Sequence, residues 1–340
     1  MTAESTLASA VRRYEPAEAA AWDDFVGRSV NGTILHTRRF LSYHGDRFSD
    51  RSLLVTNAQG RIVGVLPAAE DPADPSVVTS HPGLTYGGLV HDGRLHGESM
   101  VSALREIAAE YRSLGFTRLR YKTVPPIYHT APGADDMWAL FRLGASRSRC
   151  DLAAVINLAH RGRVWSGRRG WRKRALNSGV VTEEGWDDIA AYWGILEANL
   201  ARRHDATPTH SLAEIEYLHE RFPTQFILVT AKAGDELAAG CLYSIEGPVL
   251  QARYTATTEE GRAVSATDLV IERGIALARG RGCHFYSMGT STVDDGRELN
   301  EPQYDFKVSF GAGGVIHETY ELDLARAAAE HTAEYPSDVR

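Results

Sequence analysis

Residues 227–243 read ILVTAKAGDELAAGCLY, and residues 53–68 read LLVTNAQGRIVGVLPA. Each stretch holds two apolar runs of strand length around a polar turn that contains glycine, which is the pattern of paired strands. Each is followed by a helix-like stretch and a further strand, LGFTRLRYKT at 114–123 in the first half and RGCHFYSMGT at 281–290 in the second. The two halves of the chain therefore follow the same order of elements.

Two pairs of glycines support an internal duplication. Gly115 and Gly282 are 167 positions apart, and so are Gly144 and Gly311. We therefore predict an α+β protein of two tandem domains, 1–156 and 157–325, followed by a tail, 326–340. Each domain is expected to hold a mixed, mostly antiparallel sheet flanked by helices. Because clefts between domains are favoured ligand sites, we expect the active site where the two domains meet.

The composition narrows the class of protein. A chain of 340 residues that is 43% hydrophobic and 24% charged is long enough for two hydrophobic cores. The N-terminus lacks the apolar core of a signal peptide, and no stretch approaches the length of a membrane span. We therefore expect a cytoplasmic protein without membrane insertion. Its three cysteines lie far apart without paired spacing, so neither a disulfide nor a zinc site is predicted.

One segment departs from the acidic character of the chain. The net charge of −7 argues against a surface coated with cations, but the run RGRVWSGRRGWRKR at 161–174 contains no acidic residue. Its basic residues are Arg161, Arg163, Arg168, Arg169, Arg172, Lys173 and Arg174. Trp165 and Trp171 lie among them. This mixture fits a nucleic-acid contact, because cations bind phosphates and exposed bases stack on aromatic rings. A solvated linker helix with inward tryptophans is the alternative.

Four strings resemble the FemAB-like aminoacyltransferases, which carry the GCN5-related N-acetyltransferase (GNAT) fold in duplicate. In chain order they are WSGRRGWRKRALNSGVVTEE at 165–184, RHDATPTHSLAEIEYLHERFP at 203–223, LQARYTATTEEGRAVSATDL at 250–269 and GTSTVDDGRELNEPQYDFKVSFGAGG at 289–314. Together with the first-half hairpin and the Tyr-Gly-Gly turn, they span most of the chain. The resemblance implies two tandem GNAT-like domains.

The resemblance also implies an activity. Such an enzyme is an N-acyltransferase that moves an aminoacyl group from aminoacyl-tRNA, or an acyl group, to the amine of a small or sugar-linked acceptor. The setting would be natural-product or cell-envelope biosynthesis. Aminoacyl-tRNA or acyl-CoA would act as a co-substrate, with no tightly bound cofactor and no metal. The sequence does not indicate an oligomeric state.

One loop departs from the CoA-dependent members of the fold. In those members the loop begins with Gln or Arg and continues with glycines, and its backbone N–H groups bind the pyrophosphate of the cofactor. Here the loop at 258–263 reads TEEGRA, so the leading cation is missing and two carboxylates stand beside the anion site. Each would repel a pyrophosphate by roughly 1 kcal/mol if partly exposed. This departure favours aminoacyl-tRNA over acyl-CoA, which stays the alternative donor.

Acyl transfer to an amine needs stabilisation of a developing oxyanion and no covalent nucleophile. Phe306 and Lys307 match a phenylalanine-lysine pair near the end of FemAB-like proteins, whose lysine stabilises charge in the reacting complex. The alternative is a strand lysine that points at solvent. Asp305 and Asp268 are the candidate general bases, although carboxylates at these positions more often serve as helix-end or turn residues.

The remaining candidates fall into two groups. The predicted acceptor-binding residues are Arg253, Tyr254, Asn300, Ser291, Tyr86 and His36. The predicted donor-binding residues are Arg168, Arg169, Arg172, Lys173, Trp171, Gly261 and Arg262. Arg253 lies in an apolar strand, where a charged side chain must reach a partner or face a cleft. A different class of protein stays open, namely a non-catalytic nucleotide- or RNA-binding protein of the same fold.

Overall fold

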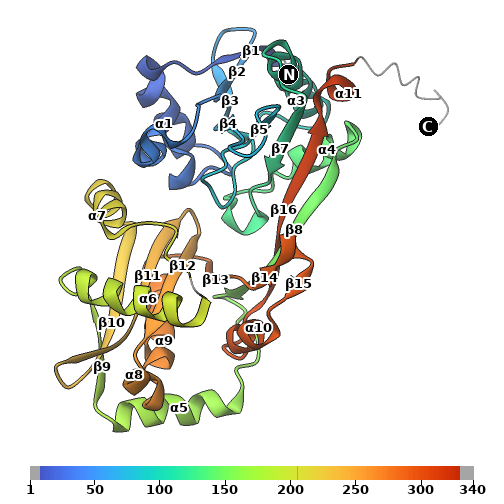
Figure 1. Ribbon diagram of the computed structural model, residues 1–340. Helices are drawn as coiled ribbons and strands as arrows, with labels where there is room; N and C mark the ends of the chain where they lie inside the picture. Colours follow the sequence, from blue (N-terminus) through green and yellow to red (C-terminus); the bar gives the residue numbers. More distant parts are fainter. Residues whose placement is uncertain (1–7, 205, 330–340) are drawn as a thin grey trace.

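The structure is a computed structural model and describes residues 8–204 and 206–329. The first half forms an N-terminal lobe, which is uppermost in Figure 1. Its elements are β1 (Ala8–Arg13), η1 (Pro16–Glu18), α1 (Ala19–Gly27), η2 (Ile34–His36), α2 (Arg38–Leu41), η3 (Ser42–Arg47), β2 (Leu53–Asn57), β3 (Ile62–Leu66), β4 (Ala69–Glu70), β5 (Val77–Thr79), β6 (Val90–His91), α3 (Glu98–Ser113), β7 (Arg118–Lys122), η4 (Pro126–Tyr128), α4 (Asp135–Arg142) and β8 (Ser146–Asn157).

The second half forms a C-terminal lobe below it. Its elements are α5 (Ser166–Asn177), β9 (Val180–Glu184), α6 (Ile189–His204), α7 (Leu212–Arg221), β10 (Phe226–Ala233), β11 (Glu236–Glu246), β12 (Val249–Thr257), α8 (Glu259–Ala263), α9 (Ala266–Gly280), β13 (Phe285–Thr290), β14 (Thr292–Val293), η5 (Asp294–Gly296), β15 (Glu298–Leu299) and α10 (Glu301–Val308). The chain then continues into β16 (Gly313–Asp323) and α11 (Leu324–Ala328).

The internal duplication is visible in the elements themselves. The helix α3 and the strand β7 have α9 and β13 as counterparts, and α4 and β8 have α10 and β16, each pair close to 167 positions apart. The four marker glycines follow these helices directly and all have positive φ, from +72° to +91°. Glycine adopts this backbone without a side-chain clash, so it ends each helix and turns the chain into the next strand.

The final strands of the two halves are exchanged between the lobes. β16 pairs with β7 of the N-terminal lobe and with β8, and β8 in turn pairs with β13 of the C-terminal lobe. As a result, one ten-stranded sheet runs through both lobes in the order β4-β5-β7-β16-β8-β13-β12-β11-β10-β9. In Figure 1 the long strands β8 and β16 lie side by side along one edge of the molecule.

This exchange modifies the predicted organisation. The sequence analysis assigned residues 157–325 to a second domain and 326–340 to a tail, yet Leu322, Leu324 and Ala327 are buried in the core of the N-terminal lobe. The division of the chain near residue 157 stays a prediction. The first residues of the predicted tail belong to α11, which packs on α3, and residues 330–340 lie outside the described residues.

Helices cover both faces of the sheet in the C-terminal lobe. The apolar side of α9 packs on β10, β11 and β12, and α6 packs on the other face against β11 and β12. Ser211 begins α7 with a capping box, because its hydroxyl accepts from the backbone N–H of Glu214 and the Glu214 carboxylate accepts from the backbone N–H of Ser211. The predicted α+β class, with mostly antiparallel sheets flanked by helices, is confirmed. The sheets are not divided one to a domain, because the mixed ten-stranded sheet runs through both lobes and the N-terminal lobe also holds an antiparallel four-stranded sheet, β1-β2-β3-β6.

The exchange gives a test of how the lobes are held together. Leu322 is fully buried in the N-terminal core, whereas Ile316 on the same strand is 45% exposed. We expect Leu322→Ala to lower the free energy of unfolding by about 2–5 kcal/mol, since it removes buried methyl groups and leaves a cavity. Ile316→Ala, the control, should change it by less than about 0.5 kcal/mol. Urea unfolding measures both, and equal effects would contradict the exchanged-strand packing.

Candidate active site

A cleft begins where two parallel strands part. β12 and β13 pair at only three positions, from Val249 opposite Phe285 to Gln251 opposite Ser287. Beyond these pairs β12 continues to Thr257 and β13 to Thr290 without pairing to each other. The wedge between them opens into a cleft of about 1230 Å³ that is lined by residues of both lobes. Cavities of this size accept small molecules or the reacting end of a larger one.

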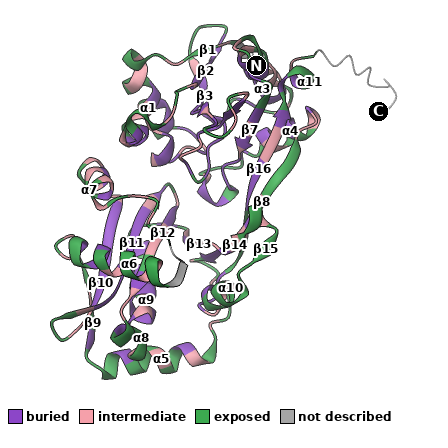
Figure 2. Ribbon diagram, viewed as in Figure 1, coloured by how far each residue is buried: buried purple, intermediate pink, exposed green. Residues whose placement is uncertain are grey.

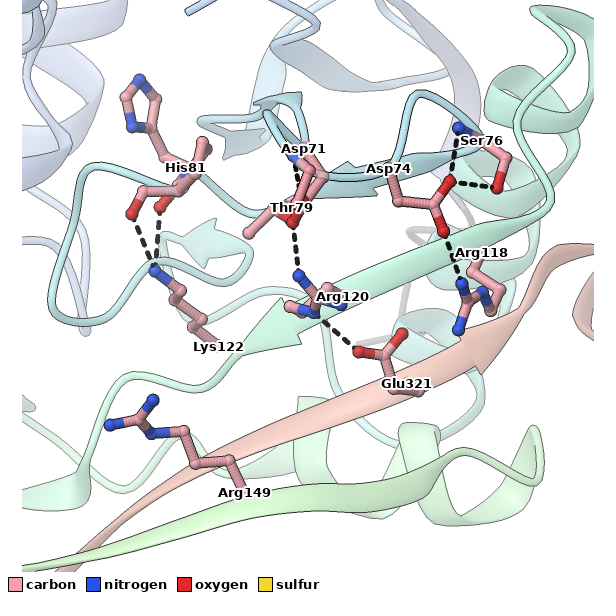
Figure 3. Close-up of polar contacts among 12 residues, drawn as sticks. Asp71, Asp74, Ser76, Thr79, His81, Arg118, Arg120, Lys122, Arg149 and Glu321 are labelled. Atoms are coloured by element: carbon pink, nitrogen blue, oxygen red, sulfur yellow. Dashed lines mark hydrogen bonds and ion pairs between the residues drawn. The ribbon is translucent and has the colours of Figure 1, made fainter. Parts of the chain in front are cut away.

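The N-terminal lobe has a matching wedge, but its own chain fills it. β5 and β7 also pair at three positions, after which the segment 80–87 occupies the space. Lys122 holds this segment, since its ammonium donates to the carbonyls of His81, Pro82 and Leu84 at 3.3, 3.1 and 2.8 Å. Figure 3 shows Arg118, Arg120 and Lys122 of β7 reaching towards this side of the sheet.

The segment that fills the N-terminal wedge also forms one wall of the open cleft in the C-terminal lobe. Pro82 to Tyr86 line the cleft from the N-terminal side. At the Tyr-Gly-Gly turn, residues 86–88, two stretches of backbone approach closely, because a Cβ on Gly87 would lie 2.0 Å from the carbonyl oxygen of Ser80. Only glycine fits at this position. The turn thereby directs Tyr86 into the cleft.

Lys307 lies at the edge of the open wedge. The sequence analysis considered a strand lysine that points at solvent, and this alternative is wrong, because residues 301–308 form helix α10 and Lys307 is only 8% exposed. The Asn300 side chain caps this helix by accepting from the N–H of Gln303 at 3.2 Å. The Lys307 ammonium donates to the carbonyls of Gly289 and Thr290 at 3.0 and 2.7 Å.

Burial changes the charge of this lysine. The ammonium has no carboxylate partner among the described residues, and desolvation lowers the pKa of Lys307 to about 8. Lys307 is therefore cationic at neutral pH and loses its proton far more easily than an exposed lysine. A compact donor of this kind can stabilise negative charge that develops on an acyl oxygen in the cleft.

A buried ion pair closes one end of the cleft. Arg168 of α5 donates to both carboxylate oxygens of Asp268 on α9, at 3.0 and 3.2 Å, and both side chains are less than a tenth exposed. The guanidinium also lies 4.0 to 4.5 Å from the ring centres of Trp171, Phe306 and Phe310. These contacts hold α5 against α9 and α10. Asp268 and Arg168 thus face the cleft as a closed pair.

The floor of the cleft carries a second buried pair, between Arg253 on β12 and Glu246 at the end of β11. The Glu246 carboxylate accepts from Arg253 Nη2 at 2.5 Å, and from Tyr86 Oη of the other lobe at 2.6 Å. Nearby, Tyr128 Oη donates to the Gln251 amide oxygen at 2.9 Å, again across the lobes. The floor is therefore built where the two lobes touch.

One wall holds a chain of three hydrogen-bonded side chains. Tyr43 Oη lies 3.2 Å from His210 Nε2, and His210 Nδ1 lies 2.7 Å from Tyr254 Oη. Burial lowers the pKa of His210 to about 4, so the imidazole is neutral at pH 7. Neutral imidazole between two phenols can accept or pass a proton. Tyr43 comes from the N-terminal lobe and the other two from the C-terminal lobe.

The loop at 258–263 does not form an open anion site. Thr258 Oγ1 accepts from the N–H of Gly261 at 2.9 Å, and residues 259–263 form the short helix α8. Gly261 is required by packing, since a Cβ there would lie 2.0 Å from the carbonyl oxygen of Ala238. Glu259 pairs with Arg202 at 2.5 Å. Arg262 is the residue of this loop that lines the cleft.

The structure brings most of the predicted residues together. The predicted residues that line the cleft are Lys307, Phe306, Asp268, Arg253, Tyr254, Asn300, Tyr86, Arg168, Trp171 and Arg262. Those that lie outside its lining are Asp305, Ser291, His36, Gly261, Arg169, Arg172 and Lys173. His36 is fully buried and supports the Tyr-Gly-Gly turn through the carbonyl of Gly87, at 3.0 Å. Asp305 is exposed on α10, and the last three are exposed on α5.

The sequence analysis missed several residues of the site. Glu246, Tyr128, Gln251, Tyr43 and His210 all line the cleft. One signal was available for the first of them, since the charge of Arg253 in an apolar strand required a partner and Glu246 is the acid that ends the preceding strand. The others depend on contacts between lobes, which no local pattern indicates.

The described residues hold neither a cluster of metal ligands nor a helix that could cross a membrane. No group of three or more histidine, cysteine, aspartate or glutamate side chains within residues 8–204 and 206–329 could hold a metal ion. In the same part of the chain, every helix is too short or too polar to cross a membrane.

Comparisons with known proteins agree with this geometry. A family model described as "Acetyltransferase (GNAT) domain" matches residues 159–307, which contain the open wedge and Lys307. No curated protein matches the sequence.

Three solved structures share the fold over nearly the whole chain. FemX is 12% identical with a TM-score of 0.66, covering 92% of this chain and 97% of its own. L-PGS from Bacillus licheniformis is 11% identical with a TM-score of 0.57, covering 90% and 91%. A tandem GNAT protein from the clavulanic acid biosynthesis pathway is 14% identical with a TM-score of 0.50, covering 93% and 98%.

Fold and site together define an acyltransferase of the GNAT class. Residues 159–307 match the GNAT domain model, and the two-lobed fold is shared with FemX, so the fold that the resemblance to FemAB-like proteins implies is confirmed.

The pKa of Lys307 gives a test by pH. Because burial lowers it to about 8, the ammonium is present below that pH and is lost as the pH rises through it. We expect kcat/KM to fall above pH 8 when hydroxylamine, which stays neutral there, is the acceptor. Lys307→Arg should keep residual activity without this fall, because guanidinium stays charged. A wild-type profile that stays flat to pH 10 would contradict a role for the cation.

Proposed function

We propose that the chain transfers an aminoacyl group from aminoacyl-tRNA to the amine of a small or sugar-linked acceptor. The observation that carries the choice of donor is the exposed cationic side of α5, next to the mouth of the cleft. Arg169, Arg172 and Lys173 are exposed there and have no acidic partner among the described residues. Figure 2 shows α5 as largely exposed. Such a surface suits the phosphates of an RNA.

Two further features support an RNA donor. Trp171 lines the cleft and packs edge to face against Trp165, which is 54% exposed, with ring centres 5.2 Å apart. An exposed indole beside cations can stack on the unpaired bases at the end of a tRNA. The loop at 258–263 presents the exposed Glu260, beside a Glu259 that pairs with Arg202, where a CoA pyrophosphate would need donors. Both features favour tRNA over CoA.

The chemistry needs no covalent enzyme intermediate. The acceptor amine attacks the ester carbonyl, a C–N bond forms, the bond to the ribose oxygen breaks, and that oxygen takes a proton. Lys307 stabilises the negative charge on the reacting carbonyl group. His210, between Tyr43 and Tyr254, can relay the proton that the amine loses along this hydrogen-bonded chain without holding it. Both residues line the same cleft.

An acyl-CoA donor is the second candidate. The observation in its favour is that Arg262 lines the cleft at the end of the loop where CoA-dependent members bind pyrophosphate. Since aminoacyl-tRNA is made in the cytoplasm, the first candidate also implies a cytoplasmic reaction. A role in natural-product or cell-envelope biosynthesis is part of the same proposal.

The donor is tested by offering pools of charged tRNA or of acyl-CoA together with candidate amines, and detecting products by mass spectrometry. We expect product with charged tRNA only, and its loss when ribonuclease is added first. Product with acyl-CoA that ribonuclease does not affect would overturn the choice of donor. No product with either donor would favour a non-catalytic binding protein.

The cationic surface is tested separately by binding. Replacing Arg169, Arg172 and Lys173 together by Gln should weaken tRNA binding roughly tenfold or more at low salt, and reduce its salt dependence. A matched control replaces three exposed arginines of the N-terminal lobe, Arg28, Arg61 and Arg112, by Gln. Equal weakening in both triple variants would contradict a specific role for α5.

A further inference from the structure

Arg253 occupies an irregular position in its strand. In the pairing of β11 with β12, Leu242 lies opposite Tyr254 and Tyr243 lies opposite Ala252, so Arg253 has no residue opposite it. This is a β-bulge, which redirects a side chain relative to its neighbours and is common beside active sites. Here it allows a guanidinium to lie in the cleft floor of a strand that is otherwise largely apolar.

The guanidinium is only partly used by the protein. Arg253 Nε donates to Ser244 Oγ at 2.8 Å, and Nη2 donates to Glu246 Oε1 at 2.5 Å. The N–H groups of Nη1 have no acceptor among the described residues. The side chain lines the cleft and is 15% exposed. It therefore keeps donors available to a ligand.

The carboxylate that neutralises Arg253 is, in contrast, fully used. Glu246 is 1% exposed, and its two oxygens accept from Arg253, Ser244 and Tyr86. The pair is thus asymmetric. The protein uses both carboxylate oxygens of Glu246, whereas the guanidinium of Arg253 keeps N–H donors that a ligand can use. A ligand would meet the cation.

The other charged residues of the cleft also favour an anionic ligand. Its acidic lining residues are Glu246 and Asp268, and both are already paired. Lys307 and Arg262 add positive charge without acidic partners in the part of the chain that the structure describes. The cleft therefore has an excess of unpaired donors and favours an anionic group on its ligand.

The shape of the site selects among anions. A guanidinium presents a planar fork that matches a carboxylate with two parallel hydrogen bonds. The surroundings of Arg253 are tyrosine rings, with Tyr86, Tyr128 and Tyr254 lining the same cleft. A phosphate dianion would require more cations at this point than one half-used arginine. A single planar carboxylate fits the available donors.

We infer that the acceptor of this enzyme is an amine that also carries a carboxylate, such as an amino acid or a peptide with a free C-terminus, and that Arg253 binds the carboxylate. This inference rests on the proposed function, in which the cleft holds the acceptor amine. Arg253 is a specificity-determining residue for that acceptor, because it recognises a group remote from the reacting nitrogen.

The test compares acceptors that differ only at the carboxylate. Amino acids and dipeptides are each offered beside their C-terminal carboxamides, and kcat/KM is measured by mass spectrometry of the acylated products. We expect the free acids to be preferred roughly tenfold to a hundredfold, as for a charged hydrogen bond. Equal use of acids and amides by an active wild-type enzyme would overturn the inference.

Two variants separate recognition from folding. Arg253→Lys keeps the charge and loses the fork. The double variant with Arg253→Gln and Glu246→Gln removes both charges together, so no buried carboxylate is left unpaired. Both variants should lose most of the preference for acids while their thermal unfolding stays close to that of wild type. A stable double variant that keeps the full preference would overturn the assignment to Arg253.

A binding measurement tests the carboxylate site even if the proposed reaction does not occur. If no donor yields product, calorimetric titration of the wild type with alanyl-alanine and with alanyl-alanine amide still decides the carboxylate site. Tighter binding of the free acid, abolished in the double variant, would support the site even if the proposed reaction fails. Equal binding, or stronger binding of inorganic phosphate than of the free acid, would overturn it.

Discussion

The backbone pairing of β8 with β16 joins the two lobes into one sheet. Each of these strands ends one half of the duplicated chain, and each lies beside a strand of the other lobe. Because backbone hydrogen bonds fix their register, from Gly313 opposite Val155 to Glu321 opposite Ser146, the two lobes share one sheet. The cleft between them is therefore a feature of a single hydrogen-bonded framework.

The duplication gives both lobes a wedge, but only the wedge of the C-terminal lobe is open in the described part of the chain. Both lobes contain a pair of parallel strands that part after three positions. In the N-terminal lobe, the segment 80–87 after β5 fills the gap between the strands and is held there by Lys122. Residues of this segment line the cleft of the other lobe. In the C-terminal lobe the gap stays open, and Lys307 donates to the carbonyls at the end of β13. The partly buried Lys122 thus stabilises the closed wedge, and the buried Lys307 lies at the edge of the open one.

Much of the fold could be predicted because its signals are local. The hairpins, the capping box of α7 and the glycines that end the helices follow from patterns of a few residues. The exchange of β8 and β16 could not be predicted, since either strand pairs equally well within its own half as far as local pattern shows. The segment around Lys307 contains alternating apolar residues, and its helical state depends on the cap at Asn300 and on packing against α5.

The site was predictable in part for the same reason. Lys307, Phe306 and Tyr86 came from matched motifs, whereas Glu246 and His210 gain their role from partners on the other lobe. Their local sequence, an acid before Gly-Pro and a histidine in a loop, is ordinary turn chemistry. Where two lobes build a site jointly, a sequence motif can show one contributor, and the partner becomes visible once the lobes are placed together.

Acyl transfer is proposed to occur in the open wedge between β12 and β13. A crystal structure with an adenosine that carries an amide-linked 3′-aminoacyl group, which resists transfer, tests it most directly. We expect the amide carbonyl to lie between the two strands, within hydrogen-bond distance of Lys307 Nζ. An acyl group bound outside this wedge, with Lys307 still donating only to Gly289 and Thr290, would contradict it.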